Sequence, residues 1–230
     1  MSTPELIVIT PTADQPLGMR LAERYMARQT VQPTRWIVAD DGATHATLTA
    51  GQEHLRRART VDGGPSLAGN LLAALDALGP VSGAIVIWEH DDWYAARHLE
   101  LCQTRLKTCG ATGSIWQRYY NVPTRMFRIM RNIGSALCNT AFDASYRDLL
   151  RRAAEHAIAH NHYGIDRRLW EALPARARDL HQDNTVLGIK GLPGRAGLGV
   201  GHRPKREQWH ADPEGAMLRT WIGADAEHYL

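Results

Sequence analysis

Three carboxylates and a histidine follow directly on an apolar run in the stretch AIVIWEHDDWY, residues 84–94. Like charges at this spacing repel one another, and their removal from water is costly unless a cation or hydrogen-bond donors compensate. Three interpretations are open: a solvated loop that begins a helix, paired carboxylates for acid–base catalysis, or a site for a hard cation. We favour the cation site, because Mg²⁺ and Mn²⁺ bind carboxylate oxygens together with substrate phosphates.

Two other apolar runs also end in polar residues. The run IVITPT ends at Thr10, Pro11 and Thr12, and WIVADDG ends at Asp40, Asp41 and Gly42. In open α/β sheets, ligands bind beyond the carboxyl ends of the parallel strands. Turn chemistry explains each ending by itself, but three such endings in this order indicate a single ligand crevice.

The segments that must position these endings alternate between strand-like and helix-like patterns. Strands are predicted at residues 5–10, 35–39 and 84–88, and helices at residues 16–29, 66–79 and 95–107. This alternation predicts an α/β fold with a mostly parallel central sheet flanked by helices. The second half predicts two antiparallel strands (114–122 and 124–132), a helix (146–160) and, from about residue 212, a terminal appendage of uncertain order.

The composition is that of an ordinary globular protein, with 230 residues, 44% of them hydrophobic and 22% charged. No apolar run approaches the roughly 20 residues that span a bilayer. The start, MSTPELIVIT, has no basic residue before its apolar run, and the three cysteines form neither a disulfide framework nor a metal motif. We therefore expect a cytoplasmic protein with no membrane partner. The net charge of +3 permits a polyanionic partner without requiring one.

Four motifs in register carry a family resemblance. The order IVITPT, WIVADDG, GPSLAGNLLAAL and IVIWEHDDWY resembles the nucleotide-sugar glycosyltransferases of the GT-A fold, in the broad family-2-like group, over about residues 5–110. Glu89-His90-Asp91 stands where that group has Asp-x-Asp, so the first acid is glutamate here. The resemblance implies one Rossmann-like GT-A domain, residues 1–211, with a nucleotide-sugar-binding half (1–110) and an acceptor-binding half (111–211).

The same resemblance implies a nucleotide-sugar donor, expected to be a UDP-sugar, and a divalent cofactor, Mn²⁺ or Mg²⁺. Asp40 would hydrogen-bond the base or ribose, Glu89 would face the ribose or a metal-bound water, and Asp91 would bind the metal that bridges the diphosphate. In the nucleotide-sugar-binding half, residues 1–110, the resemblance implies these donor-binding residues: Thr10, Pro11, Thr12, Asp40, Asp62, Asn70, Glu89 and Asp91.

Residues 164–173, GIDRRLWEAL, are similar to the helix start on which inverting members of the group carry their catalytic base. Asp166 would take the proton of the acceptor hydroxyl while that oxygen attacks the anomeric carbon, and Trp170 would border the acceptor. The alternative is that Asp166 is a first-turn acid that offsets Arg167 and Arg168.

A glycine-dense segment, GIKGLPGRAGLGVGHRPKR at residues 188–206, could approach an anion closely with its backbone N–H groups. Lys190 and Arg195 would add positive charge to a diphosphate, and His202 would be a further protein ligand to the metal. The alternatives are a flexible surface loop with a solvated histidine, or a lid that orders when the donor binds.

The glycine-dense segment also resembles a small phage-type group of GT-A enzymes associated with TET/JBP-like pyrimidine hydroxylases. That resemblance implies a hydroxymethylated pyrimidine base in DNA as the acceptor, and the host cytoplasm as the location. Basic and aromatic residues interleave in residues 116–131, which suits phosphate contact and base stacking, so we expect Arg118 and Tyr120 to contact the acceptor. An arginine-rich solvated face is the alternative.

Other functions stay open from the sequence. A glycosyltransferase could act on a small molecule or a glycan, and a nucleic-acid-binding module would need no catalysis. A nucleotidyltransferase is disfavoured, because a glycine-rich basic loop is expected directly after its first strand and TPTADQP contains neither glycine nor a basic residue.

Overall fold

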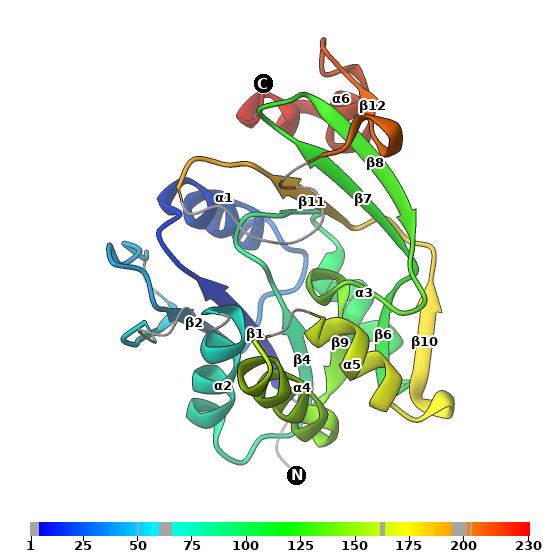
Figure 1. The fold of residues 1–230 in the computed structure, drawn as a ribbon. Helices are drawn as coiled ribbons and strands as arrows, with labels where there is room; N and C mark the ends of the chain where they lie inside the picture. Colours follow the sequence, from blue (N-terminus) through cyan, green and yellow to red (C-terminus); the bar gives the residue numbers. More distant parts are fainter. Residues whose placement is uncertain (1–4, 50, 60–65, 162–163, 195–201, 203) are drawn as a thin grey trace.

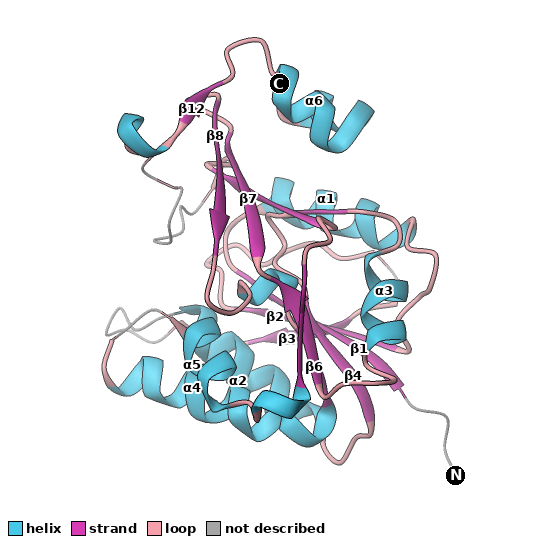
Figure 2. Cartoon of the chain, turned by 90° about the vertical axis from the view of Figure 1, so that its right-hand side faces the viewer, coloured by secondary structure: helices cyan, strands magenta, loops and turns pink. Residues whose placement is uncertain are grey.

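The computed structural model of the chain describes residues 5–49, 51–59, 66–161, 164–194, 202 and 204–230. A seven-stranded sheet forms the centre, with the strand order β10-β6-β9-β4-β1-β2-β3. Helices cover both of its faces, and a five-stranded sheet with the order β12-β8-β7-β11-β5 lies beside one end of it (Figures 1 and 2).

The central sheet is mostly parallel, as predicted. Its parallel core consists of β1 (Glu5–Thr12), β2 (Arg35–Asp40), β3 (Glu53–Arg56) and β4 (Gly83–Ile87). Antiparallel β9 (Ala141–Asp143) joins β4 to β6 (Ala111–Ser114), which pairs with β10 (Arg178–His181). Because the first four strands run in one direction, their carboxyl ends meet at one edge, and Thr12, Asp40 and Arg56 are direct neighbours there.

Alternation along the strands builds two hydrophobic cores. Leu6 and Val8 face a core with α1 (Pro16–Ala27) and α3 (His98–Arg105), whereas Ile7 and Ile9 face the other. The helices of the second core are α2 (Ser66–Leu78), α4 (Arg147–Ala159) and α5 (Ile165–Ala172). A strand buried on both faces reads as a continuous apolar run, which is why these strands were predictable. No helix within the described part of the chain is long and apolar enough to cross a membrane.

The second sheet confirms the predicted antiparallel pair. Its strands are β5 (Trp93–Tyr94), β7 (Trp116–Asn121), β8 (Met126–Arg131), β11 (Val186–Lys190) and β12 (His210–Ala211). β7 and β8 form the antiparallel pair, and β11 lies between β7 and β5. The glycine-dense segment therefore begins within a buried strand, which ends at Lys190.

The C-terminal residues are packed, although we expected an appendage of uncertain order. Helix α6 (Ala216–Ile222) contributes Leu218 to the first core, and Tyr229 lies with its hydroxyl 2.6 Å from that of Tyr25 on α1. Asp225 accepts a hydrogen bond of 2.7 Å from Trp93 Nε1 and pairs with Arg28. These contacts fasten the end of the chain to the region of α1 and to the second sheet.

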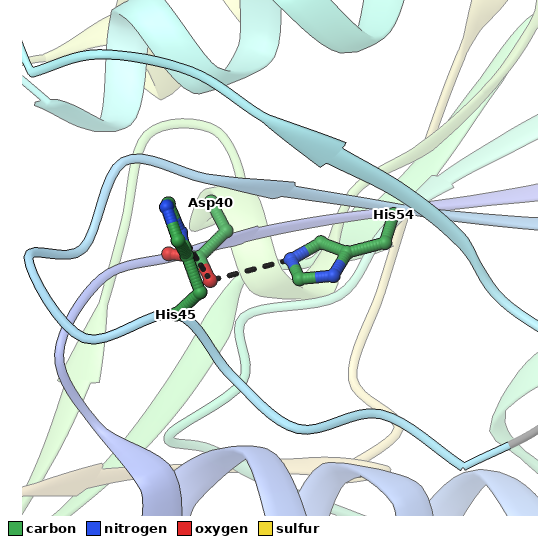
Figure 3. Close-up of side chains that lie close together, drawn as sticks. All are labelled: Asp40, His45 and His54. Carbon is green, nitrogen blue, oxygen red and sulfur yellow. Dashed lines mark hydrogen bonds and ion pairs between the residues drawn. The ribbon is translucent and has the colours of Figure 1, made fainter.

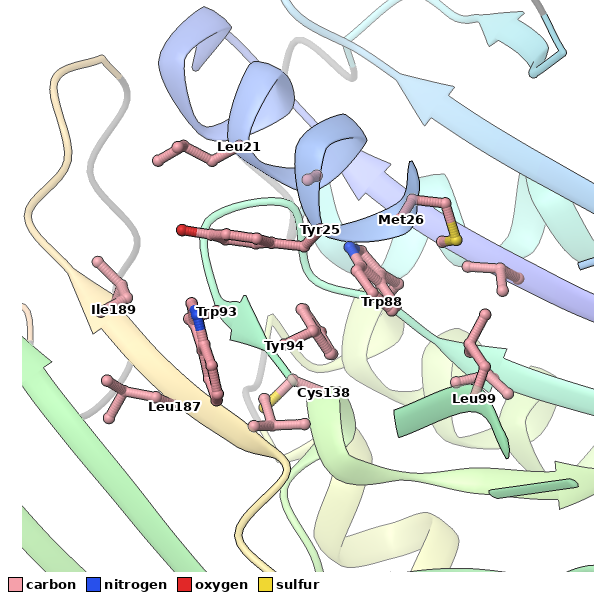
Figure 4. Packing of buried hydrophobic residues seen from close by; sticks show 14 of the residues in the cluster. Leu21, Tyr25, Met26, Trp88, Trp93, Tyr94, Leu99, Cys138, Leu187 and Ile189 are labelled. Carbon is pink, nitrogen blue, oxygen red and sulfur yellow. The ribbon is translucent and has the colours of Figure 1, made fainter. Parts of the chain in front are cut away.

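An aromatic stack fixes the direction in which the chain leaves β4. Trp88 is fully buried, and the centre of its ring lies 3.6 Å from that of Tyr94 with an interplanar angle of 12° (Figure 4). Such a pair contributes roughly 0.5–1.5 kcal/mol beyond its buried area. The Tyr94 hydroxyl accepts the backbone N–H of Glu89 at 2.7 Å, so the stack also holds the first residue of the acidic stretch.

Candidate functional site

Charged side chains gather where the chain leaves β4. We call Glu89, Asp91, Asp92 and Lys190 the acid cluster. Lys190, the last residue of β11, places Nζ 3.0 Å from Asp92 Oδ1 and 3.8 Å from Asp91 Oδ2. Both partners are sheltered from solvent, with 8% of the Lys190 side chain and 14% of the Asp91 side chain exposed. Three carboxylates thus face one ammonium group, and a second cation would balance their charge.

The three carboxyl groups of the acid cluster differ in pKa. Burial, reinforced by Asp92, raises the pKa of Glu89 to about 8, against the effect of Lys190. Burial also raises the pKa of Asp92, to about 6. Burial acts in the same direction on Asp91, but Lys190, His90 and His202 lower its pKa below the ordinary value. Without a bound cation, Asp91 is therefore ionised at neutral pH and so is most of Asp92, while Glu89 retains a proton.

Asp92 ties the acid cluster to the second sheet. Its Oδ1 accepts the backbone N–H of Ile189 at 2.9 Å as well as the Lys190 ammonium. Its Oδ2 is buried without a hydrogen-bond donor of ordinary geometry among the described residues. Ligand atoms of Glu89, Asp92 and Cys138 all lie within 4.8 Å of one another. From the sequence, Asp92 was recognised as part of an acidic run, but neither Asp92 nor Cys138 was predicted to be a site residue.

His202 lies within electrostatic range of Asp91, because its protonated form would lower the pKa of that carboxylate. Its Nδ1 is buried, with no hydrogen-bond partner within the described residues. Burial and then Lys190 lower its pKa, against the effect of Asp91, so the imidazole is neutral and able to bind a metal. An unpaired imidazole nitrogen beside buried carboxylates fits a divalent cation. Arg195 and Asp62, also predicted to bind the donor, lie outside the described residues.

Asp166 occupies the first turn of α5, after Gly164, which has a left-handed backbone (φ 108°). Its Oδ1 accepts the N–H of Arg167 at 2.8 Å, as a first-turn acid would. Burial raises its pKa, and its own charge helps to raise the pKa of Glu89. Asp166 is thus within electrostatic range of the acid cluster, although Oδ1 also performs the local role that the alternative interpretation gave it.

Three residues expected to contact ligands are instead buried in the protein. Thr10 is fully buried and accepts a hydrogen bond of 2.8 Å from Trp36 Nε1. Tyr120 is fully buried in the first core. Trp170 is 3% exposed and donates from Nε1 to Thr140 Oγ1 at 3.0 Å. These side chains therefore make contacts within the protein in place of contacts with a ligand. Arg118, by contrast, is only half-buried, with its guanidinium 5.1 Å from the centre of the Trp221 ring.

Asp40 also differs from its expected role as a contact to the base or ribose. It is fully buried, and its two oxygens accept the backbone N–H groups of Gly42 and Ala46, each at 2.8 Å. Asn70 is nearly as buried, and donates to Thr12 O at 3.0 Å and to Asp41 Oδ1 at 3.1 Å. Both side chains shape the loops at the strand ends, because short polar side chains bond neighbouring backbone groups readily.

The middle residue of the acid-x-Asp stretch is held by β1. His90 places Nδ1 3.0 Å from the carbonyl oxygen of Pro11 and Nε2 3.1 Å from Gln15 Oε1. Pro11 and Thr12 themselves are buried. His90 therefore links the stretch after β4 to the end of β1 and to Gln15 before α1.

An open cavity of about 520 Å³ lies beyond the ends of β2 and β3. We call it the arginine pocket, and its lining residues are Asp41, Gly42, Ala43, His45, Arg56, Arg57, Ala58 and Arg59. Arg57 Nη1 donates to Asn70 Oδ1 at 3.1 Å, and Arg59 Nη2 donates to Asp14 Oδ2 at 2.5 Å. Guanidinium groups at a cavity suit a phosphate or carboxylate ligand. We missed this pocket from the sequence, although the basic run HLRRAR carried the signal.

Comparison with known proteins identifies a structure of similar fold. No family model matches the sequence, and no curated protein matches it. The structure is similar to that of 2-C-methyl-D-erythritol 4-phosphate cytidylyltransferase from Thermus thermophilus, with a TM-score of 0.50 and 16% sequence identity. The match covers 78% of this chain and 89% of that chain. At this identity the likeness establishes a Rossmann-like α/β fold and carries no statement about chemistry.

Proposed function

We propose that the chain is a metal-dependent glycosyltransferase that moves a sugar from a nucleotide-sugar donor to a hydroxyl acceptor. The observation that carries the proposal is the meeting of Asp91, Lys190 and His202 at the end of β4, with Asp166 in electrostatic range of Glu89. This arrangement offers a place for a cation and a diphosphate next to a carboxylate of raised pKa. A nucleic-acid-binding module would have no need of such a buried charge cluster.

Asp91 and His202 would hold Mn²⁺ or Mg²⁺, and Lys190 would help to orient the diphosphate. When bound, the cation would neutralise negative charge on the departing nucleoside diphosphate. The arginine pocket lies at the neighbouring strand ends, and we place the nucleotide half of the donor, expected to be a UDP-sugar, toward it. The loops ending β1 and β2 would then act through their backbone, since the side chains of Thr10 and Asp40 are buried.

Asp166 would act as the general base of an inverting transfer. A carboxylate whose pKa is raised by burial accepts a proton more readily near neutral pH than an exposed one. The buried indole of Trp170, bonded to Thr140, would hold α5 in place and thus position Asp166.

As the acceptor we propose a hydroxymethylated pyrimidine base in DNA. The second sheet supports this choice, because it carries basic side chains beside aromatic rings: Arg118 lies over Trp221, and Arg128 Nη1 donates to Gln208 Oε1 at 2.8 Å next to Trp209. A base in a duplex would have to leave its stack to reach Asp166. A small-molecule or glycan hydroxyl is the alternative acceptor.

A nucleotidyltransferase is the second candidate, favoured by the likeness of the fold to that of a cytidylyltransferase. Residues 13–15, which follow β1, contain no basic side chain to hold a triphosphate. The two candidates differ in what they release, which makes them separable in one assay.

The test incubates the full chain with Mn²⁺, a panel of nucleotide sugars, and either plain or hydroxymethylated DNA. We expect free nucleoside diphosphate only with modified DNA, and none after chelation of the metal. Release of nucleoside diphosphate with a glycan instead of DNA would identify a glycan as the acceptor. Release of pyrophosphate from a nucleoside triphosphate and a sugar phosphate would identify the protein as a nucleotidyltransferase. No release of either product with any substrate pair would contradict the proposal.

A further inference from the structure

A second group of side chains of the types that bind metals is formed by β2, β3 and the loop between them. Figure 3 shows Asp40, His45 and His54 turned toward one another. Asp40 Oδ2 lies 3.3 Å from His54 Nε2 and 3.4 Å from His45 Nδ1. The three ligand atoms all lie within 4.8 Å of one another. We call this group the Asp-His-His cluster.

Strand register brings two of the three residues together. His54 on β3 is the direct neighbour of Val38 on β2, and Asp40 lies two residues further along β2 on the same face as Val38. His45 comes from the loop that links the two strands. The cluster is thus built mainly on sheet backbone, and the exposed fractions of its side chains are 1% for Asp40, 18% for His54 and 33% for His45.

Hydrogen bonding alone leaves the Asp-His-His cluster poorly satisfied. The two distances of 3.3 Å and 3.4 Å are long for bonds to a carboxylate, which are usually about 2.7–2.9 Å when the donor is charged. His45 Nδ1 is buried and has no hydrogen-bond partner among the described residues. A buried nitrogen in this state calls for a ligand that the protein itself does not supply.

The spacing matches a tetrahedral metal. Ligand atoms at about 2.0–2.1 Å from zinc, separated by the tetrahedral angle, lie about 3.3–3.4 Å from one another. Both distances from Asp40 Oδ2 fall on this value. We propose that Asp40, His45 and His54 bind a zinc ion, with the fourth position left for water or for an oxygen of a ligand in the arginine pocket, which His45 borders.

The surroundings fit this assignment. The N–H groups of Gly42 and Ala46 hold the Asp40 carboxylate at 2.8 Å each, as partners outside a metal site commonly hold its ligands, and Oδ2 keeps a second lone pair for the ion. The nearby guanidinium groups of Arg57 and Arg59 would repel a cation, but the carboxylate of Asp41 lies 3.5 Å and 3.9 Å from them and offsets their charge.

This site is separate from the acid cluster, and its assignment does not depend on the proposed sugar transfer. Two imidazoles and one carboxylate suit zinc, whereas the oxygen-rich acid cluster suits Mn²⁺ or Mg²⁺. The Asp-His-His cluster would fasten the loop after β2, and so shape one wall of the arginine pocket. Zinc bound there would also attract an anionic group into that pocket.

The test measures Zn²⁺ binding by the full chain in competition with a chromogenic chelator, with no substrate present. The Asp91→Asn/Cys138→Ser background removes one ligand from each of the two sets that could bind zinc near the acid cluster, Asp91 with His202 and Glu89 with Asp92 and Cys138. In this background we expect one zinc site, with the affinity lowered at least about tenfold by His45→Gln and by His54→Gln, since each removes a ligand. The double variant His156→Gln/His160→Gln, which removes the stacked histidine pair at the end of α4, should keep the affinity.

Circular dichroism would check that each variant is folded. If His54→Gln does not fold, the zinc affinity of the loop variant His45→Gln tests the proposal by itself. Equal zinc affinity with and without His45→Gln in the Asp91→Asn/Cys138→Ser background, or no zinc site in that background, overturns the proposal. Because the readout is metal binding, its failure is distinct from a failure of glycosyl transfer.

Discussion

Lys190 Nζ and Asp92 Oδ1 lie 3.0 Å apart, and this contact joins the loop after β4 to the second sheet. The N–H of Ile189 bonds the same oxygen, so the two segments share a single carboxylate. The side chains are 8% and 1% exposed, which places the pair in the interior. Removal of one partner from a buried pair leaves the other charge without compensation.

Lys190→Met should therefore destabilise the protein strongly. We expect the free energy of unfolding to fall by about 3–5 kcal/mol, the usual cost of breaking a buried pair from one side. Urea unfolding followed by tryptophan fluorescence measures the change. Lys107→Met removes an exposed lysine and should leave the midpoint within about 0.5 kcal/mol of the parent. Equal stability of the two variants would contradict the role given to the pair.

Asp91→Asn should abolish metal-dependent transfer. Asp91 is the carboxylate of the acid cluster with the lowered pKa, and the amide would neither ligate Mn²⁺ well nor balance Lys190. We expect kcat/KM to fall at least about 100-fold, which corresponds to about 3 kcal/mol of lost transition-state stabilisation. Asp148→Asn on α4, whose side chain is 69% exposed, is the matched control. Retention of activity at saturating Mn²⁺ would place the metal elsewhere.

Asp166→Asn should lower kcat while leaving the KM for the donor nearly unchanged. A general base contributes about 10²–10⁴-fold to the rate and little to ground-state binding. Steady-state kinetics with the donor varied separates the two quantities. Glu171→Gln on the same helix removes an exposed acid paired with Arg167 and serves as the control. An increase in KM alone would make Asp166 a binding residue or a first-turn acid only.

Protonation of Asp225 should lower the free energy of unfolding at acidic pH. Burial by itself raises its pKa, but the hydrogen bond from Trp93 and the charge of Arg28 outweigh this effect and lower it below the ordinary value of 3.8. The stabilisation is therefore complete above pH 3.8 and is lost as the pH falls through the lower, folded pKa. Asp225→Asn should cost about 1–3 kcal/mol at neutral pH. Urea unfolding at several pH values should find this difference shrinking below pH 3.8, and a constant difference would contradict the assignment.

Much of the central sheet was predictable, because its strands are continuous apolar runs and its helices carry regular apolar spacing. Residues 35–39 and 84–88, for example, differ from β2 and β4 by no more than one residue at either end. The packing of the C-terminal segment was not predictable, since it depends on contacts with α1 and Trp93, which are distant in the sequence.

The site was predictable in part. The acid cluster, Lys190 and His202 are brought together as their types suggested, because charged groups that follow a buried strand need partners nearby. The burial of Thr10 and Tyr120 could not be read from the chain, since a polar residue at a strand end looks the same whether it bonds a ligand or a tryptophan. The arginine pocket depends on β3, a short strand without an apolar run.

The hydroxyl contact between Tyr25 and Tyr229 has a practical meaning for anyone who shortens the chain. A fragment that stops at residue 211 would uncover the Tyr25 ring and the indole edge of Trp93, which Asp225 now covers. We expect such a fragment to self-associate through this newly exposed aromatic surface, so that size-exclusion chromatography would find aggregates in place of a smaller monomer.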